Sequence, residues 1–352
     1  MTNIKGSHAM RRKRSVGQRF LSGLLQIGLV FATVGQEAIA EDGTMLQIEK
    51  IEAVAYGAFV NGHFSRLNSM VEDFRSSKGR LPDGRWKLTF VTSGLTRGVV
   101  PRDVAAWEAR LAIFDKWLST TPDDPVPHLA KAIALVSYAW DARGGGYANS
   151  VKESDWPIFR KRIADARAVL EKAPKISKNN PLWYDTMQTI ALAQSWPMEN
   201  YGKLFQEGVD KEPTYYFLYF NAASYFLPRW HGNPSDLAKF VDYAVEKSSR
   251  QEGQTLYARI YWSLLWALRD NTFAPAYAQW PRMRQGFSDI VKSYPDNWNL
   301  NAFVYYACMA KDSATVRQIA PRLKTIEKDL WEDPNAYKTC LETALKGSGK
   351  TQ

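Results

Sequence analysis

The 352-residue sequence contains little of what metal and nucleophile chemistry requires. It has two cysteines and four histidines, and none of them stand at the spacing of a zinc site. The metalloprotease and hydrolase motifs H-E-x-x-H and G-x-S-x-G are absent, and the terminal Gly349-Lys350-Thr351 has Ala344 where a phosphate loop needs glycine. We therefore expect no metal, no cofactor and no catalytic residues, which favours a non-catalytic protein and leaves an enzyme as the alternative.

Long hydrophobic runs are also missing. The longest mostly apolar stretch, Phe20 to Val34, has fifteen residues and is interrupted by Gln26, whereas a membrane-spanning helix needs about twenty apolar residues. Basic residues 11–14 precede this stretch, and Ala38-Ile39-Ala40 follows it as a small-x-small cleavage pattern. Residues 1–40 are thus predicted to be a signal peptide, with Met10 as an alternative start and an uncleaved anchor as the alternative reading. We expect export to the periplasm or the exterior, with no transmembrane span after cleavage.

A strong charge of one sign is missing once the leader is set aside. The whole chain carries a net charge of +10, but residues 1–40 hold six basic residues and one acidic residue, which leaves about +5 for the rest. Nucleic-acid binders have a clustered basic surface. The sequence therefore predicts no nucleic-acid partner.

Helical blocks of one kind recur from Pro125 onward. Each is a turn, a helix rich in aromatic and small residues, and a more charged helix, and further copies begin at Asn179, Lys211, Gly253 and Pro295. Repeated hairpins cannot bury their apolar faces alone, so they stack. We predict an all-α fold of stacked antiparallel helical hairpins over residues 101–346, behind a less regular helical cap at 41–100 and before a disordered tail at 347–352. In this the chain resembles tetratricopeptide-repeat proteins, which form a superhelix or solenoid.

Local patterns predict several boundaries. One buried helix face is formed by residues at a 3-4-3-4 spacing, namely Val104, Trp107, Leu111, Phe114 and Leu118. Asn233 and Asp312 are expected to cap helices, the second of which Pro321 should kink. The segment 86–100 is rich in β-branched residues, which allows a short strand or a loop that crosses the helix layer. The helix from Thr214 is apolar all round, which predicts a central position.

One short motif is more specific. Leu227-Pro228-Arg229-Trp230-His231-Gly232 resembles the L-P-R-W-G-G signature of a bacterial family known as domain of unknown function 4034, with His231 in place of a glycine. Asn301, Cys308 and Cys340 also look like the C-terminal section of that family, and the resemblance covers roughly residues 83–345. It implies an exported or envelope-facing helical-repeat protein and carries no established activity.

Within this motif, Arg229, Trp230 and His231 are the candidate ligand-binding residues. A cation beside an indole on a tight turn could hold an anionic or sugar ligand. Alternatively, Arg229 stacks on Trp230 and bonds to the carbonyl groups that end the preceding helix. His231 is read as a loop histidine, since neither His63 nor His128 stands at ligand spacing with it.

The two cysteines, Cys308 and Cys340, lie in the last two predicted hairpins. In an oxidising compartment, two thiols on neighbouring helices favour a disulfide. The alternative is two buried free thiols that act as small hydrophobic groups.

Aromatic and basic residues are abundant in the exported part, which holds all thirteen tryptophans. Large rings fill wide helix contacts, but they also line sugar and peptide grooves. The densest positive region is read as a solvated face, with an acidic partner surface as the alternative. It comprises Arg160, Lys161, Arg162, Arg167, Lys172, Lys175 and Lys178.

Two hypotheses for the function follow. The first is a non-catalytic scaffold in the bacterial envelope whose concave helical surface binds a protein or peptide. The alternative is a glycan-binding protein or an enzyme that acts on carbohydrate or envelope glycan, built on a helical toroid. Such an enzyme requires two acids about 5–10 Å apart in an aromatic cleft, for which Asp185 and Asp242 are candidates. The oligomeric state is left open.

Overall fold

The computed structural model describes residues 43–331 and 333–346, apart from the side chain of Pro334. The predicted signal peptide and the tail at 347–352 lie outside the described residues. Within them every regular element is a helix, and the one β-type pairing is an isolated bridge between Arg80 and Trp86. The prediction of an all-α protein is therefore confirmed.

The α-helices in chain order are α1 (Thr44–Val60), α2 (Phe64–Ser76), α3 (Leu88–Leu95), α4 (Val104–Thr120), α5 (Pro125–Arg143), α6 (Asp155–Lys172), α7 (Pro181–Ala193), α8 (Met198–Lys211), α9 (Tyr216–Tyr225), α10 (Pro234–Glu252), α11 (Thr255–Ser263), α12 (Leu265–Leu268), α13 (Trp280–Ser293), α14 (Asn297–Met309), α15 (Ser313–Ile319) and α16 (Pro334–Lys346). Short 3-10 helices lie between them, including η3 (Lys175–Asn179) and η5 (Ala320–Arg322).

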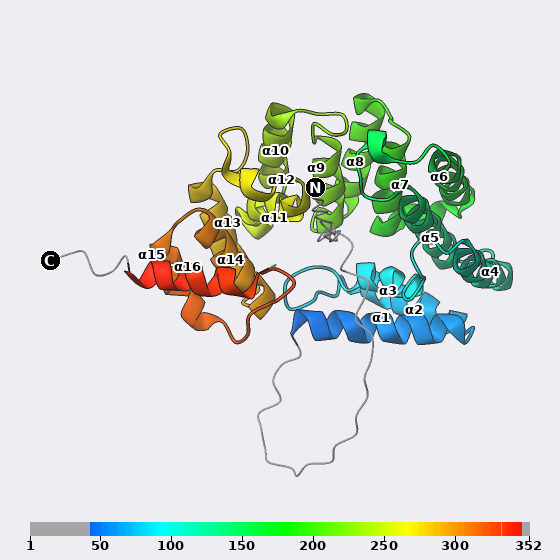
Figure 1. Ribbon diagram of the computed structural model, residues 1–352. Helices are drawn as coiled ribbons and strands as arrows, with labels where there is room; N and C mark the ends of the chain where they lie inside the picture. Colours follow the sequence, from blue (N-terminus) through cyan, green and yellow to red (C-terminus); the bar gives the residue numbers. More distant parts are fainter. Residues whose placement is uncertain (1–42, 332, 347–352) are drawn as a thin grey trace, which may run out of the picture.

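The helices form pairs that follow one another around an arch (Figure 1). α5 packs on α6, α7 on α8, α9 on α10, α11 on α13, and α14 on α15. The first members of successive pairs also pack on one another, α5 on α7, α7 on α9 and α9 on α11. Each pair thus covers an apolar face of its neighbour, as helical repeats require.

Helix starts follow the predicted capping chemistry. The side chains of Asn233 and Asp312 accept hydrogen bonds from backbone N–H groups in the first turns of α10 and α15. Pro321 does not kink its helix: α15 ends at Ile319, and the proline lies inside η5. A proline cannot donate to the carbonyl of the preceding turn, and here this loss ends the α-helix.

Two predictions near the N-terminal helices were wrong in detail. The segment 86–100 is neither a strand nor a loop, because Leu88–Leu95 forms α3, whose apolar residues are buried mainly against α1. In α4, Val104 is exposed, and Trp117 rather than Leu118 completes the buried face. The Trp117 indole stacks on Phe64 of α2, with ring centroids 5.5 Å apart. Trp117 lies one position before the residue that the 3-4-3-4 spacing predicts, and it is buried because Phe64 of α2 covers that side of α4.

A loop between α2 and α3 spans the opening of the arch (Figure 1). We call residues 79–87 the crossing loop. The carbonyl oxygen of Asp83 accepts hydrogen bonds from Arg259 Nη2 of α11 (2.5 Å) and Asn299 Nδ2 of α14 (3.2 Å). Trp86 packs edge-on against Tyr215 at the start of α9, with ring centroids 5.4 Å apart. The crossing loop therefore lies on the inner faces of α9, α11 and α14.

The two cysteines join helices α14 and α16. Cys308 of α14 and Cys340 of α16 lie at disulfide distance, with their Cα atoms 5.8 Å apart. The geometry confirms the predicted pairing. A disulfide between these two cysteines fastens α16 to α14.

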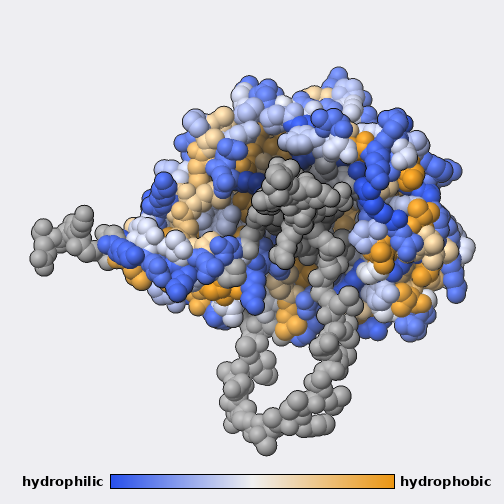
Figure 2. Space-filling view, viewed as in Figure 1, coloured by the Kyte–Doolittle hydropathy of each residue, from blue (hydrophilic) through white to orange (hydrophobic). Residues whose placement is uncertain are grey.

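The visible face of the molecule is mostly polar (Figure 2). On the face drawn in Figure 2, hydrophilic residues dominate the outer edge of the arch, and hydrophobic residues show in separate patches. In the part of the chain that the structure describes, no helix is long and apolar enough to cross a membrane.

Candidate functional site

The turn between α9 and α10 holds the candidates Arg229 and Trp230. The backbone N–H of Trp230 donates to the carbonyl of Leu227 (2.9 Å). A Cβ atom at Gly232 would overlap the backbone carbonyl group of Phe226, so this position requires glycine. The tight turn therefore has a steric cause, and it presents Arg229 and Trp230 toward the end of α5.

A second arginine, Arg143, joins them from the last turn of α5. The Cζ atoms of Arg143 and Arg229 lie 5.6 and 5.7 Å from the Trp230 ring centroid. Further rings surround both guanidinium groups at 4.9 to 5.3 Å, those of Trp140 and Trp156 around Arg143 and those of Tyr147 and Trp266 around Arg229. We call these seven residues the arginine–aromatic cluster.

The polar partners of the two arginines are loop carbonyl groups. Arg143 Nη1 donates to the carbonyls of Gly144 (3.0 Å) and Gly146 (3.1 Å), and Arg229 Nη2 donates to that of Gly145 (3.4 Å). Arg229 thus stacks on Trp230 as one alternative predicted, but it bonds to the loop after α5 rather than to the end of α9. The sequence signal for Arg143 was its place at a helix end before three glycines, which by itself indicates only a C-terminal cap.

His231 does not take part in this cluster. Its ring packs on Tyr225 with centroids 4.6 Å apart, and the residue is exposed. No group of three or more His, Cys, Asp or Glu residues within the described ranges could hold a metal ion.

Asp185 lies in a polar network among α3, α7 and α9. It accepts hydrogen bonds from Asn221 Nδ2 (2.5 Å) and from the Tyr215 hydroxyl (3.3 Å), which also bonds to Thr89 Oγ1 (2.7 Å). Burial raises the pKa of Asp185 to about 6, although the hydrogen bonds from Asn221 and Tyr215 lower it. Through the Tyr215 hydroxyl, this network joins α3 to α7 and α9.

The second candidate acid, Asp242, has different surroundings. It is exposed on α10 and forms an ion pair with Arg282 of α13. Asp185 is bonded to Asn221 and Tyr215 and Asp242 to Arg282, so the two candidates have no partner in common. The geometry gives no support to the acid pair that the glycosidase hypothesis required.

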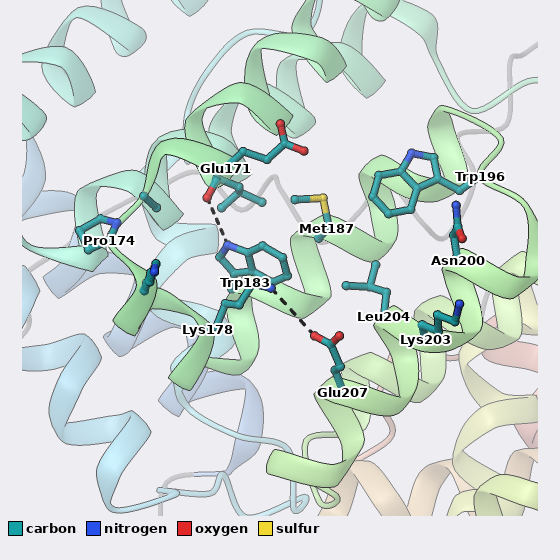
Figure 3. Close-up of a pocket in the computed structure, with 13 residues that line it drawn as sticks. Glu171, Pro174, Lys178, Trp183, Met187, Trp196, Asn200, Lys203, Leu204 and Glu207 are labelled. Carbon is teal, nitrogen blue, oxygen red and sulfur yellow. Dashed lines mark hydrogen bonds and ion pairs between the residues drawn. The ribbon is translucent and has the colours of Figure 1, made fainter.

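An open groove lies between α6 and α8 over α7, with a volume of about 490 Å³ (Figure 3). We call it the α7–α8 groove. Trp183, Met187 and Leu204 form its apolar floor, and Trp196 lies at one end. The Trp183 indole is held in place by a hydrogen bond from Nε1 to the Leu170 carbonyl (3.3 Å) and by Lys178 Nζ, 4.6 Å from its ring centroid.

Charged side chains form the rim of this groove. Glu171 pairs with Arg167 (2.7 Å), and Glu207 lies 4.0 Å from Lys178. Lys175 and the nearby Lys172 have no ion pair among the described residues. The basic region predicted to be a solvated face is thus partly neutralised. Of its described members without an ion pair, Lys172 and Lys175 lie beside the groove, whereas Arg160 lies near the start of α6.

No family model, no curated protein and no solved structure matches this chain. The sites are therefore described from this structure alone. The resemblance of the Leu227–Gly232 motif to the family of unknown function stays a prediction.

Proposed function

We propose that this protein is an exported, non-catalytic helical-repeat protein of the tetratricopeptide-like kind that binds a segment of another protein in the α7–α8 groove. The groove itself carries the proposal, since it combines an apolar floor with a charged rim, as peptide-binding sites do. The paired packing of the helices and the disulfide-distance cysteines support the repeat architecture and the export, respectively.

The rim indicates what the segment carries. Its acids already face cations, whereas Lys172 and Lys175 do not face acids, so the unbalanced charge is positive. Two exposed apolar side chains lie close to lining residues along the chain. Ile176 in η3, 61% exposed, follows Lys175, and Met198 at the start of α8, 44% exposed, lies two positions after Trp196. We therefore propose a partner segment in which an aromatic or aliphatic side chain stands next to acidic residues.

We place the partner segment in the α7–α8 groove rather than on the concave surface that the sequence suggested. The inner faces of α9, α11 and α14 are in contact with the crossing loop, whose Asp83 carbonyl uses the donors of Arg259 and Asn299. A partner there would have to displace this loop. The α7–α8 groove is open without any displacement.

Selection of displayed peptides against the purified protein tests the proposal. We expect enrichment of sequences that combine acidic residues with aromatic or aliphatic ones. Lys203 of α8 also lines the groove, where it pairs with Glu199 (2.6 Å). The double variant Lys175→Glu, Lys203→Glu reverses these two lining charges, and it should bind a selected peptide at least about tenfold more weakly, because each nearby attraction becomes a repulsion. Fluorescence polarisation of the labelled peptide gives the dissociation constants.

The matched control is Lys239→Glu, Lys247→Glu, which makes the same charge change at two positions of α10, away from the groove. It should leave the affinity within about twofold of the wild type. If both double variants weaken peptide binding equally, the change in net charge alone explains the loss of affinity, and binding in the groove is refuted. Failure to enrich any peptide would also count against it.

A further inference from the structure

The arginine–aromatic cluster contains positive charge that no acid balances. Neither Arg143 nor Arg229 forms an ion pair within residues 43–331 and 333–346. Arg143 is only 5% exposed. Its pKa is lowered, first by burial and second by the charge of Arg229. Two like charges held around one indole in a half-buried place repel each other, and an anion between them would remove that cost.

The unused polar atoms of the cluster are donors. A guanidinium group has five N–H donors, and Arg229 uses one of them in a long bond to the Gly145 carbonyl (3.4 Å). The indole Nε1 of Trp140 is buried without a hydrogen-bond partner among the described atoms, although the Trp140 ring packs on Trp230 with centroids 5.7 Å apart. A set of free donors with no free acid is suited to an oxyanion rather than to a cation or a neutral polar group.

We propose that the arginine–aromatic cluster binds a small oxyanion, a carboxylate or a phosphate monoester, between the guanidinium groups of Arg143 and Arg229. Arg143, fixed by two carbonyl groups, supplies a positioned donor. The half-buried Arg229 is the residue that first meets the ligand.

The rings around the arginines determine what else the ligand contacts. Tyr147, next to Arg229, is 67% exposed and is the most exposed large apolar side chain among the described residues. A sugar ring or short carbon chain that bears the anion can pack on it. The surrounding indoles exclude water, which strengthens the interaction between the guanidinium groups and the anion. This site is separate from the α7–α8 groove and does not depend on the proposed function.

Calorimetric titration of the whole protein with glucuronate, glucose 6-phosphate and glucose, at one ionic strength, tests the inference. We expect saturable binding of at least one of the two anionic sugars and none of glucose, and the two anions distinguish a carboxylate from a phosphate site. Arg229→Met keeps the side-chain length but removes the charge, and it should weaken binding at least about tenfold.

Two further variants keep the result interpretable. Arg250→Met removes an exposed arginine of α10 and should bind like the wild type, as should Lys175→Glu, Lys203→Glu. Should Arg229→Met fail to fold, Arg229→Lys keeps the charge but loses the planar fork, and its affinity should fall below that of the wild type. Equal binding of glucose and both anions, no binding at all, or unchanged affinity in the folded Arg229 variants would overturn the proposal.

Discussion

Substitution of Gly84 by alanine is a sharp test of how the arch is closed. Gly84 lies at the tip of the crossing loop with φ +94°, a backbone conformation that L side chains rarely adopt. A Cβ atom built there would stand 2.8 Å from Cδ2 and Cε2 of Tyr294 and 3.0 Å from Nη2 of Arg259. Two separate costs therefore arise, one from the backbone and one from the contact between the loop and the arch.

The magnitudes of these costs can be separated by a control. Alanine in the left-handed region costs about 1–2 kcal/mol, and overpacking against a fixed neighbour costs about 1–3 kcal/mol more. Gly98 has φ +75°, and no atom lies within 4 Å of the position that a Cβ atom would take there. Gly98→Ala should thus lose only the first amount of unfolding free energy, whereas Gly84→Ala should lose about 2–5 kcal/mol.

Urea denaturation of both variants measures the difference, and hydrogen exchange locates it. In Gly84→Ala, amides of the crossing loop and of α14 should exchange faster, because the Asp83 carbonyl leaves Arg259 and Asn299. Equal stability losses in the two variants would refute the tight packing of the crossing loop against Tyr294.

Two further predictions concern stability. Because the pKa of Asp185 is raised from 3.8 to about 6 in the folded protein, its contribution is fully present below about pH 3.8 and is lost as pH rises through about 6. Asp185→Asn should therefore gain up to about 3 kcal/mol relative to the wild type between pH 4 and pH 7.5, as measured by urea denaturation at each pH, and a pH-independent difference would contradict the assignment. Reduction of the Cys308–Cys340 pair, which spans 32 residues, should lower the unfolding free energy by about 3–4 kcal/mol on the chain-entropy model, and an unchanged denaturation midpoint with dithiothreitol would argue against a formed bond.

The sequence was informative where local chemistry decides structure. Apolar periodicity predicted the helices from Pro101 onward, and the side chains of Asn233 and Asp312 cap α10 and α15 as expected. The central position of α9 also followed from its composition, since Tyr216, Leu218 and Tyr219 are buried. For the two caps, the responsible hydrogen bonds lie within three residues along the chain.

Prediction was weaker where distant segments meet. The β-branched residues of α3 favour a strand in isolation, but burial of its apolar side chains against α1 stabilises a helix instead. Arg143 was not identified because only the fold brings it to Trp230, which lies 87 positions further along the chain. The crossing loop likewise gave no signal, since a Pro-Asp-Gly turn indicates a bend but not the surface on which the bend rests.

The crossing loop also bears on how the chain unfolds. A linear array of repeats has two free ends, from which it frays one unit at a time. Here the contact between Asp83 and Asn299 joins positions 216 residues apart, so the loop between α2 and α3 is held by α14. Fraying at the N-terminal side then requires the loss of contacts to α11 and α14 as well, which couples repeats that do not touch. Such long-range contacts raise the cooperativity of unfolding and slow folding, because the loop finds its place only after α14 has formed.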